Sequence, residues 1–96
     1  MNVENHQWLG LQDRVCVVTG AAGAIGFEIA RQLALTGAKV ALLDRDESGT
    51  TAMAQALADL GLKAQGFQCD VTNAASVQST ADRIAERLGP CDVLVN

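Results

Sequence analysis

Residues 19–26 have the sequence Thr-Gly-Ala-Ala-Gly-Ala-Ile-Gly and follow directly on the apolar segment Val-Cys-Val-Val at 15–18. Glycines at positions 20, 23 and 26 allow positive backbone dihedrals and leave room for a ligand to approach the main chain. A helix that starts in such a turn directs its free N–H groups at an anion. The segment therefore predicts a buried strand, a phosphate-binding turn and a helix in immediate succession.

Strand-like and helix-like segments alternate along the rest of the chain. Apolar strands are expected at 14–19, 39–43, 64–69 and 92–96. The intervening segments are long enough for right-handed crossovers between parallel strands. Hydrophobic residues make up 49% of the chain and aromatic residues only 3%, which is typical of a parallel sheet covered by helices. The predicted fold class is α/β, with a doubly wound parallel sheet.

Three helices are expected between these strands, at about 24–36, from Asp46 or Ser48 to Leu60, and from Thr72 to Leu88. Asp46 or Ser48 is expected to cap the second helix and Thr72 the third, because short polar side chains accept bonds from free N–H groups there. Apolar residues recurring every three or four positions predict the side chains that face the sheet: Ile25, Ile29, Ala30, Leu33 and Ala34; Met53, Ala56, Leu57 and Leu60; and Val77, Ala81, Ile84 and Leu88.

The chain of 96 residues has room for one small domain. Residues 11–96 are expected to form it, and residues 1–10 a loosely attached leader that touches it through Trp8, Leu9 and Leu11. No apolar run has the length of a signal-peptide core or a membrane span, so we expect a cytoplasmic protein with no membrane partner. Three cysteines without a paired spacing are expected to be buried free thiols: Cys16, Cys69 and Cys91.

The formal net charge is −4 and the pI is about 4.6. Such a balance provides no basic face for nucleic acid, which excludes nucleic-acid binding as a function class. Any phosphate must therefore be held by backbone N–H groups rather than by a cluster of lysines. No spacing of residues predicts a metal site.

Acidic residues follow two of the predicted strands. Asp44 comes eighteen residues after Gly26, at the end of the second strand, and Asp70 ends the third. Because the carboxyl ends of parallel strands share one edge, both acids can face the ligand of the glycine turn. The turn would hold a pyrophosphate, Asp44 the ribose hydroxyls, and Asp70 would lie near adenine. The plainer alternatives are a helix-capping or solvated acid at 44 and a turn acid at 70.

These segments resemble the short-chain dehydrogenase/reductase family, which shows T-G-x-x-x-G-x-G after strand one, D-V after strand three and N-N-A-G after strand four. Here stand Thr19–Gly26, Asp70-Val71 and Val93–Asn96. The resemblance implies a Rossmann-type sheet in the order 3-2-1-4. It also implies cofactor-binding residues in the turn, after strand two, after strand three and at the end of strand four: Gly20, Ala22, Gly23, Ala24, Ile25, Gly26; Asp44, Arg45; Asp70, Val71; and Asn96.

Cofactor choice follows from the acid at position 44. A carboxylate binds a free 2′-hydroxyl and repels a 2′-phosphate, so NAD is expected in preference to NADP. Arg45 could soften that preference, but alanines at 21, 22 and 24 offer no second cation. The family's middle glycine would fall at position 24, and here the glycine lies at 23. That spacing is also similar to extended members such as sugar-nucleotide epimerases and dehydratases, whereas the ending at Asn96 favours the ordinary dehydrogenase type.

The chain contains no tyrosine, so the catalytic Y-x-x-x-K of the family cannot lie within it. We therefore expect an N-terminal fragment, truncated before the catalytic half, of an oxidoreductase that transfers hydride between NAD and an alcohol or carbonyl substrate. The complete enzyme would be a homo-oligomer, and strand four would be an open edge that pairs with missing sequence. A non-catalytic dinucleotide-binding module remains an alternative. The Thr-Gly opening of the turn is a poor match to an S-adenosylmethionine methyltransferase.

Overall fold

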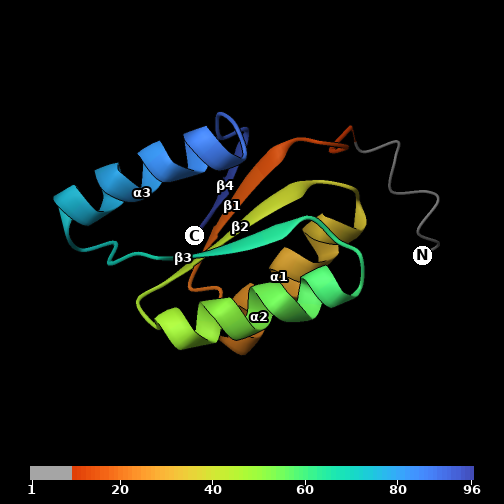
Figure 1. Ribbon diagram of the computed structural model, residues 1–96, viewed down its shortest axis with the longest axis horizontal. Coiled ribbons are helices and arrows are strands. Elements are labelled where there is room, and N and C mark those ends of the chain that lie inside the picture. The colour runs from red at the N-terminus through yellow and green to blue at the C-terminus, as the bar shows by residue number, and fades with distance from the viewer. Residues whose placement is uncertain (1–9) are drawn as a thin grey trace.

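The computed structural model describes residues 10–96 and contains one sheet of four parallel strands with three helices (Figure 1). The strands are β1 (Val15–Thr19), β2 (Lys39–Asp44), β3 (Ala64–Gln68) and β4 (Val93–Val95), in the order β3-β2-β1-β4. The helices are α1 (Ala24–Leu35), α2 (Glu47–Asp59) and α3 (Ala74–Arg87). The predicted fold class and strand order are therefore confirmed.

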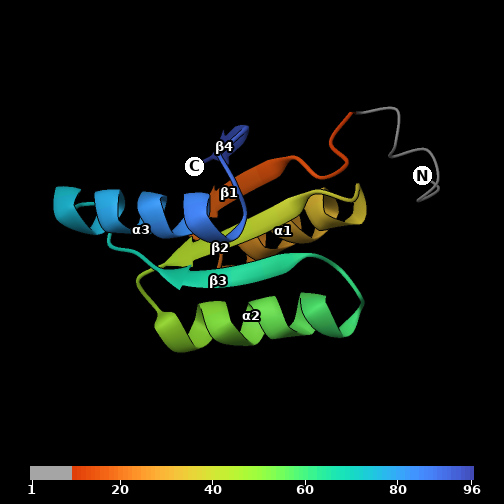
Figure 2. The same cartoon turned by 45° about the horizontal axis from the view of Figure 1, so that its top comes forward.

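The helices form two layers around the sheet. Helices α1 and α2 cover one face and α3 covers the other, as the turned view in Figure 2 shows. Because side chains alternate between the faces of a strand, each strand contributes to two cores. Cys16, Val18, Val40 and Leu42 pack toward α1 and α2, whereas Val15, Val17, Ala41 and Leu43 pack with Phe67 and with Ile84 of α3. Leu11 packs on the first core as expected, while Trp8 and Leu9 lie outside the described residues.

The predicted stripes are confirmed in part. Ala30, Ala34, Leu57 and Ile84 are buried, and four further predicted side chains pack partly buried on the cores: Ile29, Leu33, Met53 and Leu88. Ile25 is 81% exposed, and α1 buries the small side chains of Ala30 and Ala34 most fully. Helix α2 buries Thr50, Ala54 and Leu57 and leaves Ala56 and Leu60 exposed; helix α3 buries Thr80 and Ile84 and leaves Val77 and Ala81 exposed. Small side chains let a helix lie close to the sheet, and so do threonines whose hydroxyls are hydrogen-bonded within their own helix. The real stripes are rotated toward these residues, which a count of apolar positions overlooks.

Helix caps are partly as predicted. Asp46 caps α2, since its Oδ1 accepts a hydrogen bond of 3.0 Å from the Gly49 N–H. The cap of α3 is Asn73 and not Thr72: the Ser76 N–H donates to Asn73 Oδ1 at 3.1 Å. The Thr72 hydroxyl is instead directed at Asp70, to whose Oδ1 it donates at 2.6 Å. The helix consequently starts one residue later than expected.

Removing the amide cap at Asn73 is expected to destabilise the protein. Asn73→Ala should lower the free energy of unfolding by about 1 kcal/mol, because one N–H of the first turn loses its acceptor. Asn73→Asp retains the acceptor and serves as the matched control. Urea denaturation measures both, and a change in Asn73→Asp as large as that in Asn73→Ala would show that the cap is not the cause.

The three cysteines differ in exposure. Cys16 and Cys69 are buried free thiols, as predicted, whereas Cys91 is exposed and free. The expectation for Cys91 was wrong because the residue precedes β4 in a connection that α3 covers only in part. Burial also raises the pKa of the Cys16 thiol. None of the helices in residues 10–96 is long and apolar enough to cross a bilayer.

Alkylation should distinguish these thiols. Iodoacetamide at mildly alkaline pH is expected to modify Cys91 in the native protein and to reach Cys16 and Cys69 only after unfolding, since the folded chain shields both buried thiols from the reagent. Peptide mass analysis before and after denaturation locates the modified thiols. Modification of Cys16 at the rate of Cys91 would mean that the core opens readily.

Candidate functional site

Two glycines shape the turn between β1 and α1. Gly20 has a φ of +65°, which L side chains rarely adopt. At Gly26 an added Cβ would overlap the Gly20 carbonyl oxygen and lie 2.9 Å from its carbon, so the first turn of α1 packs directly on the backbone of the turn. Gly23 has an ordinary φ of −80°, and a Cβ there would meet only the Gly20 oxygen at 3.5 Å. Of the three glycines that allow a positive φ in this turn, Gly20 is the one that adopts it.

The N-terminus of α1 is free to bind an anion. Its N-cap is Gly23, which has no side chain to accept a hydrogen bond, and no acidic residue lies in the first turn of this helix. The first helical bond of α1 runs from the Phe27 N–H to the Gly23 carbonyl at 2.9 Å. The N–H groups at 24, 25 and 26 precede that bond and have no acceptor within the helix. These donors and the positive end of the helix dipole suit a phosphate.

Asp44 lies against this turn. It is the last residue of β2, and its Oδ2 accepts a hydrogen bond of 3.2 Å from the Ala22 N–H. Its Oδ1 accepts a second bond of 3.1 Å from the Asp46 N–H. Because Asp46 caps α2, Asp44 does not, and the helix-capping alternative is wrong. The half-buried carboxylate is held beside the glycine turn with lone pairs remaining on both oxygens.

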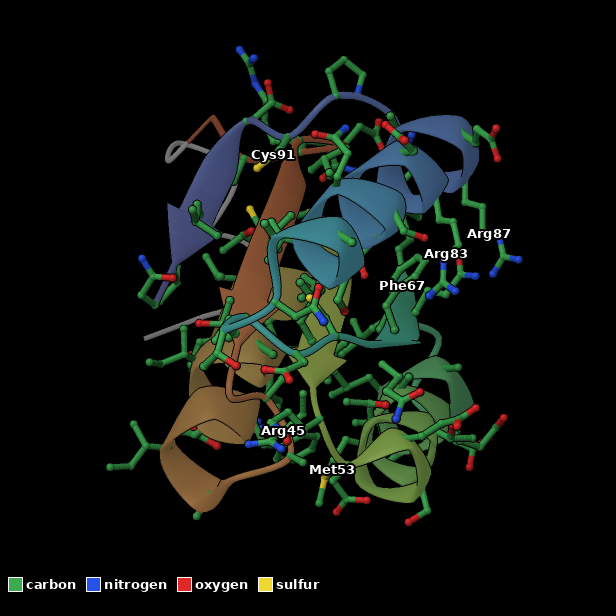
Figure 3. The ribbon with its side chains drawn as sticks, turned by 90° about the vertical axis from the view of Figure 1, so that its left-hand side faces the viewer. Arg45, Met53, Phe67, Arg83, Arg87 and Cys91 are labelled. Atoms are coloured by element: carbon green, nitrogen blue, oxygen red, sulfur yellow. The ribbon has the colours of Figure 1, made fainter. Side chains whose placement is uncertain are left out.

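Arg45 follows at the surface. Its side chain is exposed (Figure 3), and its backbone carbonyl accepts a hydrogen bond of 3.3 Å from Gln68 Nε2. Arg45 lines an open depression with the first residues of α2, so its guanidinium is accessible to solvent. The other turn residues that the sequence singled out, Ala22, Gly23 and Ala24, contribute backbone and no polar side chain.

Asp70 is a turn acid. Its Oδ1 accepts hydrogen bonds from the Thr72 hydroxyl and from the Thr72 N–H, at 2.6 and 3.0 Å. These bonds hold the pKa of Asp70 below its ordinary value, so the carboxylate stays charged at neutral pH. The turn-acid alternative at position 70 is therefore the role that these contacts show. The neighbouring Val71 is 58% exposed.

Two cavities meet at the carboxyl ends of β1 and β4. A cavity of about 210 Å³ brings together Gly20, Ile25, Gly26 and Asn96, and an apolar one of about 480 Å³ contains Leu43, Val71 and Asn96. Thr19 lines both, and its hydroxyl donates to Asn96 Oδ1 at 3.3 Å. The candidate residues of the turn and of the adenine side thus lie along one edge of the sheet.

Thr19, which opens the turn motif, and Leu43 were not among the expected cofactor-binding residues. The signal for both was their place at the end of a strand, one residue before the glycine turn and one before Asp44. Among residues 10–96, no group of three or more His, Cys, Asp or Glu side chains is arranged to hold a metal ion. The chemistry that these residues support is the binding of a phosphorylated, ribose-containing ligand.

Known proteins match this arrangement closely. A family profile described as short chain dehydrogenase matches residues 14–96. The chain is 44% identical over 86 residues to a D-threitol dehydrogenase from Mycolicibacterium smegmatis, which covers 90% of this chain and 33% of that protein. It is 47% identical over 83 residues to a cis-4-hydroxycyclohexanecarboxylate dehydrogenase from Sinomonas cyclohexanicum, covering 86% and 32% of the two chains.

Solved structures agree. A short chain dehydrogenase from Mycobacterium smegmatis superposes with a TM-score of 0.85 at 40% identity, over 90% of this chain and 37% of that one. A proposed D-mannonate oxidoreductase from Haemophilus influenza, solved with bound NAD, superposes with a TM-score of 0.88 at 29% identity, over 96% and 32%. The chain spans about a third of the length of the curated relatives it matches. From its sequence, its strand order and these matches, the chain belongs to the short-chain dehydrogenase family.

Proposed function

We propose that residues 11–96 form the NAD-binding part of an oxidoreductase that transfers hydride between a nicotinamide cofactor and an alcohol or carbonyl substrate. The observation that carries the proposal is the uncapped start of α1 beside Asp44, whose carboxylate accepts the Ala22 N–H at 3.2 Å. Family membership and the NAD bound to a structural neighbour support it. When bound, the nicotinamide supplies or accepts the hydride.

The chain's own residues divide the binding between backbone and side chains. The N–H groups at 24–26 would hold the pyrophosphate, because the small residues there leave the helix end accessible. Asp44 would accept the ribose hydroxyls through the lone pairs that the Ala22 and Asp46 bonds leave free. Val71 and Asn96, which share the apolar cavity, would flank adenine. Asp70 would lie near the same ring.

The preference for NAD over NADP rests on Asp44. A 2′-phosphate placed at this carboxylate would be repelled, and the alanines at 21, 22 and 24 supply no cation to offset that repulsion. Arg45 is exposed and adjacent, so it is the one neighbouring side chain of the β2 end that could attract a 2′-phosphate. We therefore propose NAD as the cofactor, with NADP bound more weakly.

The catalytic residues are proposed to lie in sequence beyond residue 96, since the chain has no tyrosine for a Y-x-x-x-K motif. The complete protein would act on a small alcohol or carbonyl compound and assemble as a homo-oligomer. Two alternatives would have a different sequence beyond residue 96. One is a sugar-nucleotide epimerase or dehydratase, which the glycine at 23 favours, and the other is a non-catalytic dinucleotide-binding module. The match to the short chain dehydrogenase profile supports the oxidoreductase that transfers hydride.

Calorimetric titration with NAD⁺ and NADP⁺ tests the binding step. We expect saturable binding of NAD⁺ with a lower dissociation constant than that of NADP⁺. Absence of saturable binding of either would contradict the proposal. Sequencing the gene past the codon for Asn96 tests the catalytic step, because an in-frame serine and Y-x-x-x-K support the enzyme and a stop codon there supports the binding module.

A further inference from the structure

Cations gather at the edge of the sheet opposite the glycine turn. Lys39 begins β2, Lys63 precedes β3, and Arg87 ends α3, and these three of the chain's seven lysines and arginines line one open cleft of about 320 Å³. The remaining lining residues, Leu62, Ala64, Gln65 and Leu88, carry no charge. A cleft lined by one sign of charge concentrates ions of the other sign. The accumulation is notable in a chain of net charge −4.

Two of these cations have no carboxylate partner in the part of the chain that the structure describes. The ion pairs within residues 10–96 are Arg14–Asp92, Arg31–Glu28 and Lys63–Asp13. Lys39 and Arg87 are thus available, although acids outnumber bases eleven to seven. Arg87 also complements the negative C-terminal end of the α3 dipole, which accounts for a cation at that position. On the strand side of the cleft, Lys63 is paired with Asp13, and Lys39 has no carboxylate within ion-pair distance among residues 10–96.

The guanidinium of Arg87 lies within reach of an aromatic ring. Its Cζ lies 5.9 Å from the centroid of the buried Phe67 ring, and Arg83, one turn earlier, lies 5.5 Å from the same centroid. Figure 3 shows both side chains extending from α3 on the side of Phe67. A guanidinium at this distance is attracted to the face of the ring while its N–H groups remain free to donate. Such a fork binds phosphate and carboxylate oxygens in pairs.

We propose that the cleft formed by Lys39, Lys63 and Arg87 is a second ligand site, separate from the nucleotide site, for a phosphate monoester with an apolar substituent. The three cations would take the oxyanion, and the half-buried Leu62 and Leu88 would contact the substituent. Asp13, paired with Lys63, is the carboxylate that such a ligand must compete with. Since Asp13 has a φ of +62°, which asparagine tolerates well, Asp13→Asn removes the competing charge without straining the backbone.

Titration with phenyl phosphate, followed by ¹H–¹⁵N correlation spectra at constant ionic strength, tests this site. We expect saturable shifts of the amides at 39, 63 and 87–88, separable from any at the turn 20–26, and weaker binding of inorganic phosphate. Arg87→Gln and Lys39→Gln should each weaken binding roughly tenfold, because each removes a charge-assisted hydrogen bond. Asp13→Asn should tighten it, and Arg31→Gln, a matched loss of charge on α1, should leave it unchanged.

Other outcomes would overturn the proposal. Shifts that rise linearly with concentration, or a loss in Arg31→Gln equal to that in Arg87→Gln, would mean general ionic attraction only. Equal affinity for phenyl phosphate and inorganic phosphate would mean that the apolar substituent contributes nothing to binding. Should Arg87→Gln fail to fold, Lys39→Gln and Asp13→Asn, whose effects have opposite signs, decide the question.

Discussion

Dinucleotide affinity is expected to fall by roughly 5- to 150-fold in Gly26→Ala, the equivalent of the 1–3 kcal/mol typical of overpacking. An added Cβ would overlap the Gly20 oxygen and lie 2.9 and 3.1 Å from the Gly20 carbonyl carbon and the Ala21 Cα. All three are backbone atoms of the binding turn, so relief requires the turn or the start of α1 to move. Either movement displaces the N–H groups at 24–26. Calorimetric titration with NAD⁺ and urea denaturation measure the effects on binding and stability.

Gly23→Ala is the matched control. The same methyl group is added three residues earlier, where φ is −80° and the nearest backbone oxygen would be 3.5 Å away. We expect affinity and stability close to those of the unsubstituted protein. Equal losses at 23 and 26 would mean that the turn does not hold the pyrophosphate in the way proposed.

The second large effect is expected at Asp44. Asp44→Ala should weaken NAD⁺ binding by about 1–3 kcal/mol, because the ribose hydroxyls lose a charged acceptor. Binding of NADP⁺ should weaken less, since repulsion of its 2′-phosphate disappears together with the carboxylate. The Ala22 and Asp46 N–H groups also lose their acceptor, so a smaller loss for both cofactors is expected from the turn itself. Titrations with each cofactor separate the two contributions.

Asp44→Asn refines this comparison. Its amide oxygen can still accept from the Ala22 N–H, while the negative charge is gone. We expect it to bind NAD⁺ more weakly than the unsubstituted protein and NADP⁺ as well or better. If Asp44→Ala weakened both cofactors equally and Asp44→Asn changed neither, the carboxylate would serve the turn alone and the ribose assignment would fail.

The alternation of strands and helices was predictable because its signals are local. Continuous β-branched runs, glycine stops and segment length each depend on neighbouring residues, and the strand order followed from the family resemblance. The helix faces were harder, because Thr50 and Thr80 are buried by bonding their hydroxyls to the preceding turn of their own helix. A hydropathy pattern scores such threonines as polar. Cys91 shows the converse, an apolar side chain in a connection that the fold leaves open.

The candidate site was predictable in its residues and less so in its contacts. Position at the end of a strand identified Asp44 and Asp70 as neighbours of the turn, since parallel strands end at one edge. That Asp44 accepts the Ala22 N–H, 22 residues away, depends on the exact register of β1 and β2. Thr72 and Asn73 illustrate the same limit, because two adjacent capping residues compete and only the geometry decides between them.

The register of the sheet also bears on the order in which the chain assembles during synthesis. Strand β1 pairs with β2, which pairs with β3, so these strands and α1 and α2 can associate once β3 has left the ribosome. Strand β4 pairs with β1 through Cys16 and Val93, and closing so long a loop carries a larger entropic cost. Until β4 arrives, one side of β1 is unpaired in the nascent chain, and that interval is the period in which a chaperone would protect it.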